Sequence, residues 1–81
     1  MKRITVTVLE NQENHPNYTV HVEVDIGNRT IEGPADYNAN TRHYQFHNSN
    51  NTATISHLRN TDQALIRNKI GEVVDEFIQN Q

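Results

Sequence analysis

The stretch that decides the fold is Tyr18-Thr19-Val20-His21-Val22-Glu23-Val24-Asp25-Ile26, followed directly by Gly27-Asn28. Apolar and polar residues alternate throughout residues 18–26, which is the pattern of a β-strand with one buried face. A Gly-Asn dipeptide after such a run is typical of a tight hairpin loop. The sequence therefore predicts a strand over residues 18–26 that turns back into a short strand over residues 29–32, and Gly33-Pro34 is expected to end it.

An N-terminal run over residues 2–9 also alternates, and it fits the 18–26 strand in one antiparallel register. Pairing Val8 with Val20 sets Arg3 opposite Asp25, which makes an opposite-charge cross-strand pair. A slip of one residue would set valines against threonines and move the apolar set to the other face. The predicted sheet has one apolar face and one polar face, and the polar face carries Arg3, Thr5, Thr7, His21, Glu23, Asp25 and Thr30.

The middle of the chain has a weaker pattern. Residues 35–41 show no clear period, so we expect an irregular connection there. Residues 42–47 and 52–56 read as a fourth and a fifth strand, joined by an asparagine-rich loop. This second hairpin would pair apolar residues of its two strands, namely Phe46 with Ala53 and Tyr44 with Ile55.

Residues 61–79 have the period of an amphipathic helix. Asn60 or Thr61 can cap its start, and Asn60, with Gln63 three residues later, resembles a capping box. Gly71 lies off the apolar stripe and is expected to cost up to about 1 kcal/mol relative to alanine. Because the helix has no apolar partner of its own, we expect it to cover the apolar face of the sheet. Its stripe consists of Ile66, Ile70, Val73, Val74, Phe77 and Ile78.

These elements predict a single α+β domain over residues 1–81. The expected architecture is an antiparallel sheet of four to five strands, built from β-hairpins and covered on one face by a single C-terminal helix. A chain of 81 residues buries only about 60% of the surface that its unfolded form exposes. It therefore has little room for a deep catalytic cavity.

The composition narrows the setting in which the chain works. It has a formal net charge of −3 and no cysteine, so that no disulfide and no thiolate metal site can form. No stretch approaches the roughly 20 apolar residues of a membrane span. The N-terminal residues alternate like a strand and do not form the apolar run of a signal peptide. We expect a cytoplasmic location without membrane attachment.

Residue types that carry catalysis are present, but not in catalytic arrangements. The glycines are too dispersed for a phosphate- or dinucleotide-binding loop, and neither serine lies in a glycine-flanked nucleophile turn. His43 and His47 would be separated on a strand by roughly 13 Å, which is too far for one metal ion to bridge. The sequence therefore predicts no enzyme activity, no catalytic residue, no cofactor and no metal site.

A binding surface is the remaining functional candidate. Tyr37 and Arg42 flank the irregular connection, and these residue types often anchor interfaces on loops; the alternative is that the tyrosine folds back onto the core. Glu72, Asp75 and Glu76 gather toward the C-terminal end of the helix, where the helix dipole disfavours acidic side chains. The alternative for these acids is an ordinary solvated face. We predict all of these residues as partner contacts.

In its short, asparagine-rich, cysteine-free composition the chain is similar to many small accessory proteins of bacteriophages and mobile elements, without sharing a motif. We expect a small non-enzymatic protein-binding module, an inhibitor or adaptor that occludes a partner's surface, as a monomer or a homodimer. The alternative is a small nucleic-acid-binding regulator that uses Arg42 and Arg59. The negative net charge and the polar face without aromatic residues disfavour that alternative.

Overall fold

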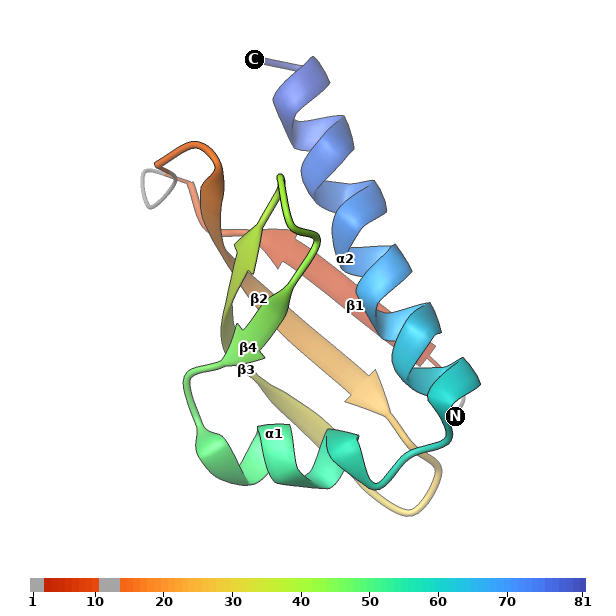
Figure 1. The fold of residues 1–81 in the computed structure, drawn as a ribbon. Helices are drawn as coiled ribbons and strands as arrows, with labels where there is room; N and C mark the ends of the chain where they lie inside the picture. Colours follow the sequence, from red (N-terminus) through yellow and green to blue (C-terminus); the bar gives the residue numbers. More distant parts are fainter. Residues whose placement is uncertain (1–2, 11–13) are drawn as a thin grey trace.

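The computed structural model describes residues 3–10 and 14–81, and it contains four strands and two helices (Figure 1). The strands form one antiparallel sheet in the order β1-β2-β3-β4. The chain thus has the predicted α+β class, and its described residues form four strands and no fifth. The elements are β1 (Arg3–Val8), β2 (Asn17–Asp25), β3 (Thr30–Asn38), β4 (Tyr44–Phe46), α1 (Ser49–Ser56) and α2 (Asn60–Gln79).

The register predicted for the first strands is confirmed. The residues of β1 pair with β2 as expected, with Val8 opposite Val20. The hairpin loop after β2 is also as predicted, because Ile26 N–H donates to the carbonyl oxygen of Arg29 at 3.1 Å. Only one register puts the apolar side chains of these strands on a common face, so the alternation was sufficient to find it. The predicted start of the first strand, at residue 2, lies outside the described residues.

β3 does not end at Gly33-Pro34, so the prediction of a strand limited to residues 29–32 is wrong. It continues to Asn38, and most of the stretch expected to be irregular is strand. Gly33 has a φ of 154°, which glycine adopts readily. Pro34 lies opposite the residue just past the end of β4, where its carbonyl oxygen accepts from His47 N–H at 3.0 Å. The missing N–H of the proline therefore removes no bond between paired strands.

The predicted strand over residues 52–56 is wrong, because this segment belongs to α1. Asn48 caps α1, since its side-chain oxygen accepts a hydrogen bond from Asn50 N–H at 2.9 Å. Strand preference is weak enough for such a cap and for tertiary contacts to override it. The expected pairs of Phe46 with Ala53 and of Tyr44 with Ile55 do not form.

β3 supplies the pairing partners that a fifth strand was expected to provide. Ala35 lies opposite Phe46, and Tyr37 lies opposite Tyr44. The fourth strand is correspondingly shorter than the predicted 42–47. Both aromatic residues of β4 are already paired with residues of β3. The segment after β4 is therefore not needed as a pairing strand, and it forms α1, which packs against β4.

α2 begins one residue before the predicted helix, but the capping box does not form. Arg59 is the N-cap and makes no side-chain capping bond. The side-chain amide of Gln63 instead donates to the carbonyl oxygen of Leu58 at 2.7 Å. Neither helix of the described residues combines the length and the apolar character needed to cross a membrane.

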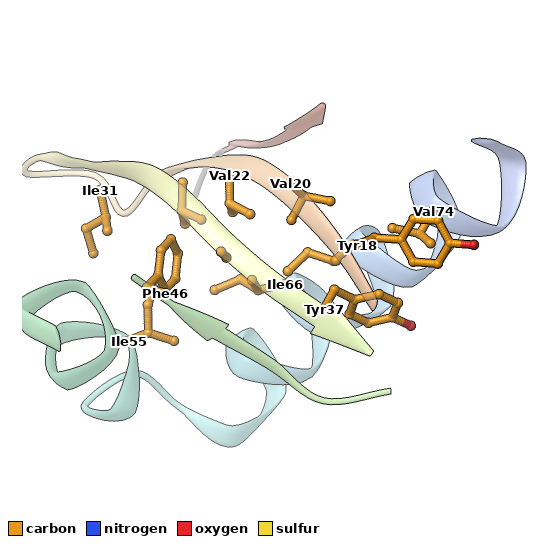
Figure 2. Close-up of a cluster of buried hydrophobic side chains, with 12 residues drawn as sticks. Tyr18, Val20, Val22, Ile31, Tyr37, Phe46, Ile55, Ile66 and Val74 are labelled. Carbon is orange, nitrogen blue, oxygen red and sulfur yellow. The ribbon is translucent and has the colours of Figure 1, made fainter. Parts of the chain in front are cut away.

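Both helices contribute to the core on the apolar face of the sheet, so a single covering helix is not confirmed. α2 contributes Ile66, Ile70 and Val74, each 0% exposed, and α1 contributes Ile55. The tyrosine rings reach one end of this cluster and direct their hydroxyls away from the aliphatic side chains (Figure 2). The buried residues of the sheet are Tyr18, Val20, Val22, Val24, Ile31, Ala35, Tyr37 and Phe46.

Candidate functional site

The connection from β3 to β4, residues 39–43, lies on the side of the sheet where α2 runs (Figure 1). A groove lies between this connection and the C-terminal half of α2. It has a volume of about 930 Å³ and is open to solvent. We call it the α2–hairpin groove. Concave surfaces of this kind are the usual places of recognition. The groove is lined by Tyr37, Arg42, Arg67, Asn68, Gly71, Glu72, Asp75, Glu76, Gln79 and Asn80.

Arg42 enters the groove from an uncommon backbone conformation. Its φ is 64°, in the left-handed region that costs a non-glycine residue about 1–2 kcal/mol. Asn38 sets the turn, because its side-chain oxygen accepts from the N–H groups of Asn40 and Thr41 and its carbonyl oxygen accepts from Arg42 N–H. Asparagine or glycine suits this conformation better than arginine does. An arginine here therefore indicates a use for its side chain.

The guanidinium of Arg42, in the hairpin formed by β3 and β4, connects this hairpin to α2 and contacts Tyr37 of β3. Its Nη1 donates to the two carboxylate oxygens of Asp75 at 3.2 and 3.1 Å, and to the hydroxyl oxygen of Tyr37 at 3.1 Å. The hydrogen bond with Tyr37, and then that with Asp75, raise the pKa of Arg42 above its ordinary value. The side chains of Arg42 and Asp75 are 53% and 45% exposed. Such a pair adds little stability, and its main effect is to hold the hairpin against the helix.

Gly71 allows α2 to approach these groups closely. A Cβ atom at this position would lie 3.0 Å from the hydroxyl oxygen of Tyr37 and 3.3 Å from Nη1 of Arg42. Both distances are shorter than ordinary van der Waals contact. The glycine that weakens the helix thus lies where the helix passes over the tyrosine hydroxyl and the guanidinium.

The rim of the groove on α2 is acidic. Glu72 and Glu76 are exposed one turn apart, and the last turn of α2 contains no basic residue. Lys69 lies 3.7 Å from Glu72, measured from Nζ to Oε1, but this exposed pair is weak. The partial negative charge at the C-terminal end of the helix adds to the field of the carboxylates. The rim therefore favours a cation.

The groove brings together all the residues that the sequence singled out as partner contacts, although they come from two distant segments. Arg42, Glu72, Asp75 and Glu76 line its walls. Tyr37 is 1% exposed, so its ring folds back onto the core, which was the alternative considered for it, and only its hydroxyl reaches the groove. That these residues contact a partner remains a prediction.

Sequence reasoning missed part of the groove. Arg67, Asn68 and Gln79 line the α2 wall, and nothing in their spacing distinguished them from other exposed helical positions. Gly71 gave a usable signal, because a glycine inside a helix and off its apolar stripe often marks a close approach of another group. The sequence does not show which group approaches the glycine.

Two further pairs of polar side chains lie outside the groove. On the polar face, His47 Nε2 lies 2.9 Å from Asp36 Oδ1, and His21 Nε2 lies 3.6 Å from Glu32 Oε2, with all of these side chains well exposed. Within residues 3–10 and 14–81, no three histidine, aspartate or glutamate side chains gather closely enough to hold a metal ion.

Comparisons with protein-family models, with curated proteins and with solved structures gave no match to this chain. Its function is inferred below from the geometry and charge of the α2–hairpin groove.

Proposed function

We propose that this chain is a small non-enzymatic protein-binding module and that the α2–hairpin groove is the surface that holds its partner. One observation carries the proposal: an arginine in a left-handed conformation and an acidic helix end whose last turn contains no basic residue meet in the same groove. Each departs from the local preference of the chain, and such departures concentrate at functional sites.

The charges of the groove favour a partner segment that carries a lysine or arginine side chain. Asp75 is already paired with Arg42, whereas Glu72 and Glu76 face solvent on the rim. A cation placed between the two glutamates would also meet the negative end of the α2 dipole. Its attraction to the rim would be strongest at low ionic strength, because exposed charges are screened by salt.

Arg42 offers the complementary contact. Its guanidinium has five N–H donors, and its hydrogen bonds to the described residues all use Nη1. Nε and Nη2 are therefore left to donate to carbonyl oxygens of a bound segment. The pairing with Asp75 holds the guanidinium in place, so that less side-chain entropy is lost on binding.

In this role the chain acts as an inhibitor or adaptor, which occludes a basic surface of its partner in the cytoplasm. Its composition, similar to that of small accessory proteins of bacteriophages and mobile elements, supports such a role. A nucleic-acid-binding regulator is less well supported, because the net charge is −3 and each of the two arginines that it would use lies beside an acid. Arg42 is bound to Asp75, and Arg59 lies 3.2 Å from Asp62.

The test starts from selection of random displayed peptides on the immobilised protein. We expect enrichment of segments that contain lysine or arginine. The affinity of an enriched peptide should fall about tenfold or more, or at least 1.4 kcal/mol, in the variant E72K/E76K. The matched control is E23K/E32K, which makes the same change of net charge on the polar face and should bind within about twofold of the wild type.

Two results would overturn the proposal. One is equal loss of binding in both variants, which would assign the effect to net charge alone. The other is enrichment of acidic peptides or of none. Retention of single-stranded DNA or RNA by the wild type at low salt, abolished by R42Q/R59Q, would establish the nucleic-acid alternative instead.

A further inference from the structure

β1 lies at an edge of the sheet, and the backbone groups on its outer side belong to alternate residues. Leu9 N–H donates to the carbonyl oxygen of Thr19 at 3.0 Å, and in the register of β1 and β2 these two residues lie directly opposite each other. Bonded and unbonded pairs alternate along an antiparallel ladder. The N–H and C=O groups of Ile4, Val6 and Val8 therefore point outward, where no segment of the described residues pairs with them.

The sequence of this edge reads nearly the same in both directions. From Ile4 to Val8 it is Ile-Thr-Val-Thr-Val, with Val6 at its centre. An antiparallel copy placed across a two-fold axis at Val6 would set Ile4 opposite Val8 and Thr5 opposite Thr7. A two-fold interface must be complementary to itself, and this edge meets that requirement. The residues joined by hydrogen bonds in this register are the ones whose backbone groups point outward.

The side chains of the edge also fit a second copy. On the apolar face, Ile4, Val6 and Val8 are only partly buried, whereas Val20, Val22 and Val24 beside them on β2 are 0% exposed. A second β1 would continue this apolar row and turn an edge into an interior. Between Ile4 and Val8 the strand carries no charge, proline or bulge, which are the features that natural edge strands use to prevent pairing.

We propose that two copies of this chain associate through their β1 edges, in the register centred on Val6, and join their sheets into one antiparallel sheet. The α2–hairpin groove involves the connection between β3 and β4, away from the β1 edge of the sheet, so that both grooves stay open. The association does not depend on the function proposed for the groove.

Two variants at the same positions test the register. In the dimer, residue 5 of one copy faces residue 7 of the other in an unbonded pair, where side chains lie closest. T5K/T7E places opposite charges in both of these pairs, and T5K/T7K places like charges there. Within one copy, the lysine at position 5 faces Glu23 in either variant, and residue 7 faces the imidazole of His21. Neither variant sets two lysines or two carboxylates opposite each other within a copy, so the monomer should tolerate both. Circular dichroism checks that both variants fold.

Sedimentation velocity over a range of concentrations measures the association. We expect the wild type to dimerise and T5K/T7E to dimerise at least as tightly. The dissociation constant of T5K/T7K should be about tenfold higher or more, because two cross-strand pairs change from attraction to repulsion. A wild type that stays monomeric up to about 1 mM, the level of very weak association, would overturn the proposal. Equal dissociation constants for the two variants would also overturn it.

Amide hydrogen exchange locates the interface within β1. In the dilute monomer, the amides of Thr5 and Thr7 should be protected by β2, and those of Ile4, Val6 and Val8 should exchange rapidly. At concentrations where the dimer forms, the second set should become protected as well. If the dimer forms while these amides still exchange rapidly, another surface is responsible and the assignment to β1 fails.

Discussion

Replacing Gly71 with alanine should destabilise the protein, although alanine is the better helix former. Inside a helix the exchange gains up to about 1 kcal/mol. The new Cβ atom would lie 3.0 Å from the hydroxyl oxygen of Tyr37 and 3.3 Å from Nη1 of Arg42. The tyrosine is 1% exposed and fixed in the core, so it yields less easily than the arginine. Overpacking of this kind costs about 1–3 kcal/mol, which leaves a net loss of roughly 0–2 kcal/mol.

The matched background is Tyr37→Phe, which removes the oxygen atom and little else. With that atom gone, the tyrosine Cζ at 3.8 Å is an ordinary contact, and the exposed Arg42 guanidinium at 3.3 Å needs to shift only slightly, which it can do while it stays paired with Asp75. In this background Gly71→Ala should stabilise the protein by up to about 1 kcal/mol. The two substitutions are therefore expected to be coupled by about 1–3 kcal/mol.

Urea denaturation followed by far-ultraviolet circular dichroism measures the free energies of unfolding of the wild type, the two single variants and the double variant. The slopes with urea should agree, so that midpoints can be compared. The reasoning is refuted if Gly71→Ala changes the stability by the same amount in both backgrounds. In that case the tyrosine hydroxyl does not lie against the helix.

Three further predictions concern α1, its cap and the half-buried phenol of Tyr44. Asn48→Ala should cost about 0.5–2 kcal/mol because it removes the cap of α1, whereas Asn60→Ala should change stability by less than about 0.5 kcal/mol, since Asn60 makes no cap bond. The midpoints of urea denaturation measure both changes, and equal losses would contradict the assignment of the caps. Ile55→Ala should cost about 2–5 kcal/mol, while Ala53→Lys should be tolerated, because only a strand would turn both Ala53 and Ile55 to the core. Severe destabilisation by Ala53→Lys would argue that residues 52–56 are not helical. Burial raises the pKa of Tyr44 above its ordinary 10.0, so the stability that the neutral phenol gives is present below pH 10 and is lost as the pH rises through the higher folded pKa. Tyr44→Phe should therefore reduce the loss of stability that urea denaturation measures at alkaline pH. An unchanged dependence of stability on alkaline pH would contradict this cause.

Five residues of the candidate site could be named from the sequence, but their assembly could not. Tyr37 and Arg42 were chosen as loop anchors and the three acids as a helix end, and each choice used only local chemistry. The hydrogen bonds between Arg42 and Asp75 join residues that are 33 positions apart. No periodicity encodes such a contact, and it depends on the angle at which α2 crosses the sheet. The left-handed conformation of Arg42 is likewise imposed by the turn at Asn38 and is not visible in the residue itself.

The sequence by itself determined the pairing of the first three strands and the extent of α2. Strict alternation permits one register with a shared apolar face, and a long apolar stripe defines a helix whatever lies beneath it. Only the tertiary structure decided the length of β3 and the conformation of residues 49–56. In short segments local preferences amount to about 1 kcal/mol or less, and they yield to whichever pairing buries more side chain. Here β3 paired with β4, with Ala35 opposite Phe46, and the segment that follows β4 became a helix that places Ile55 in the core.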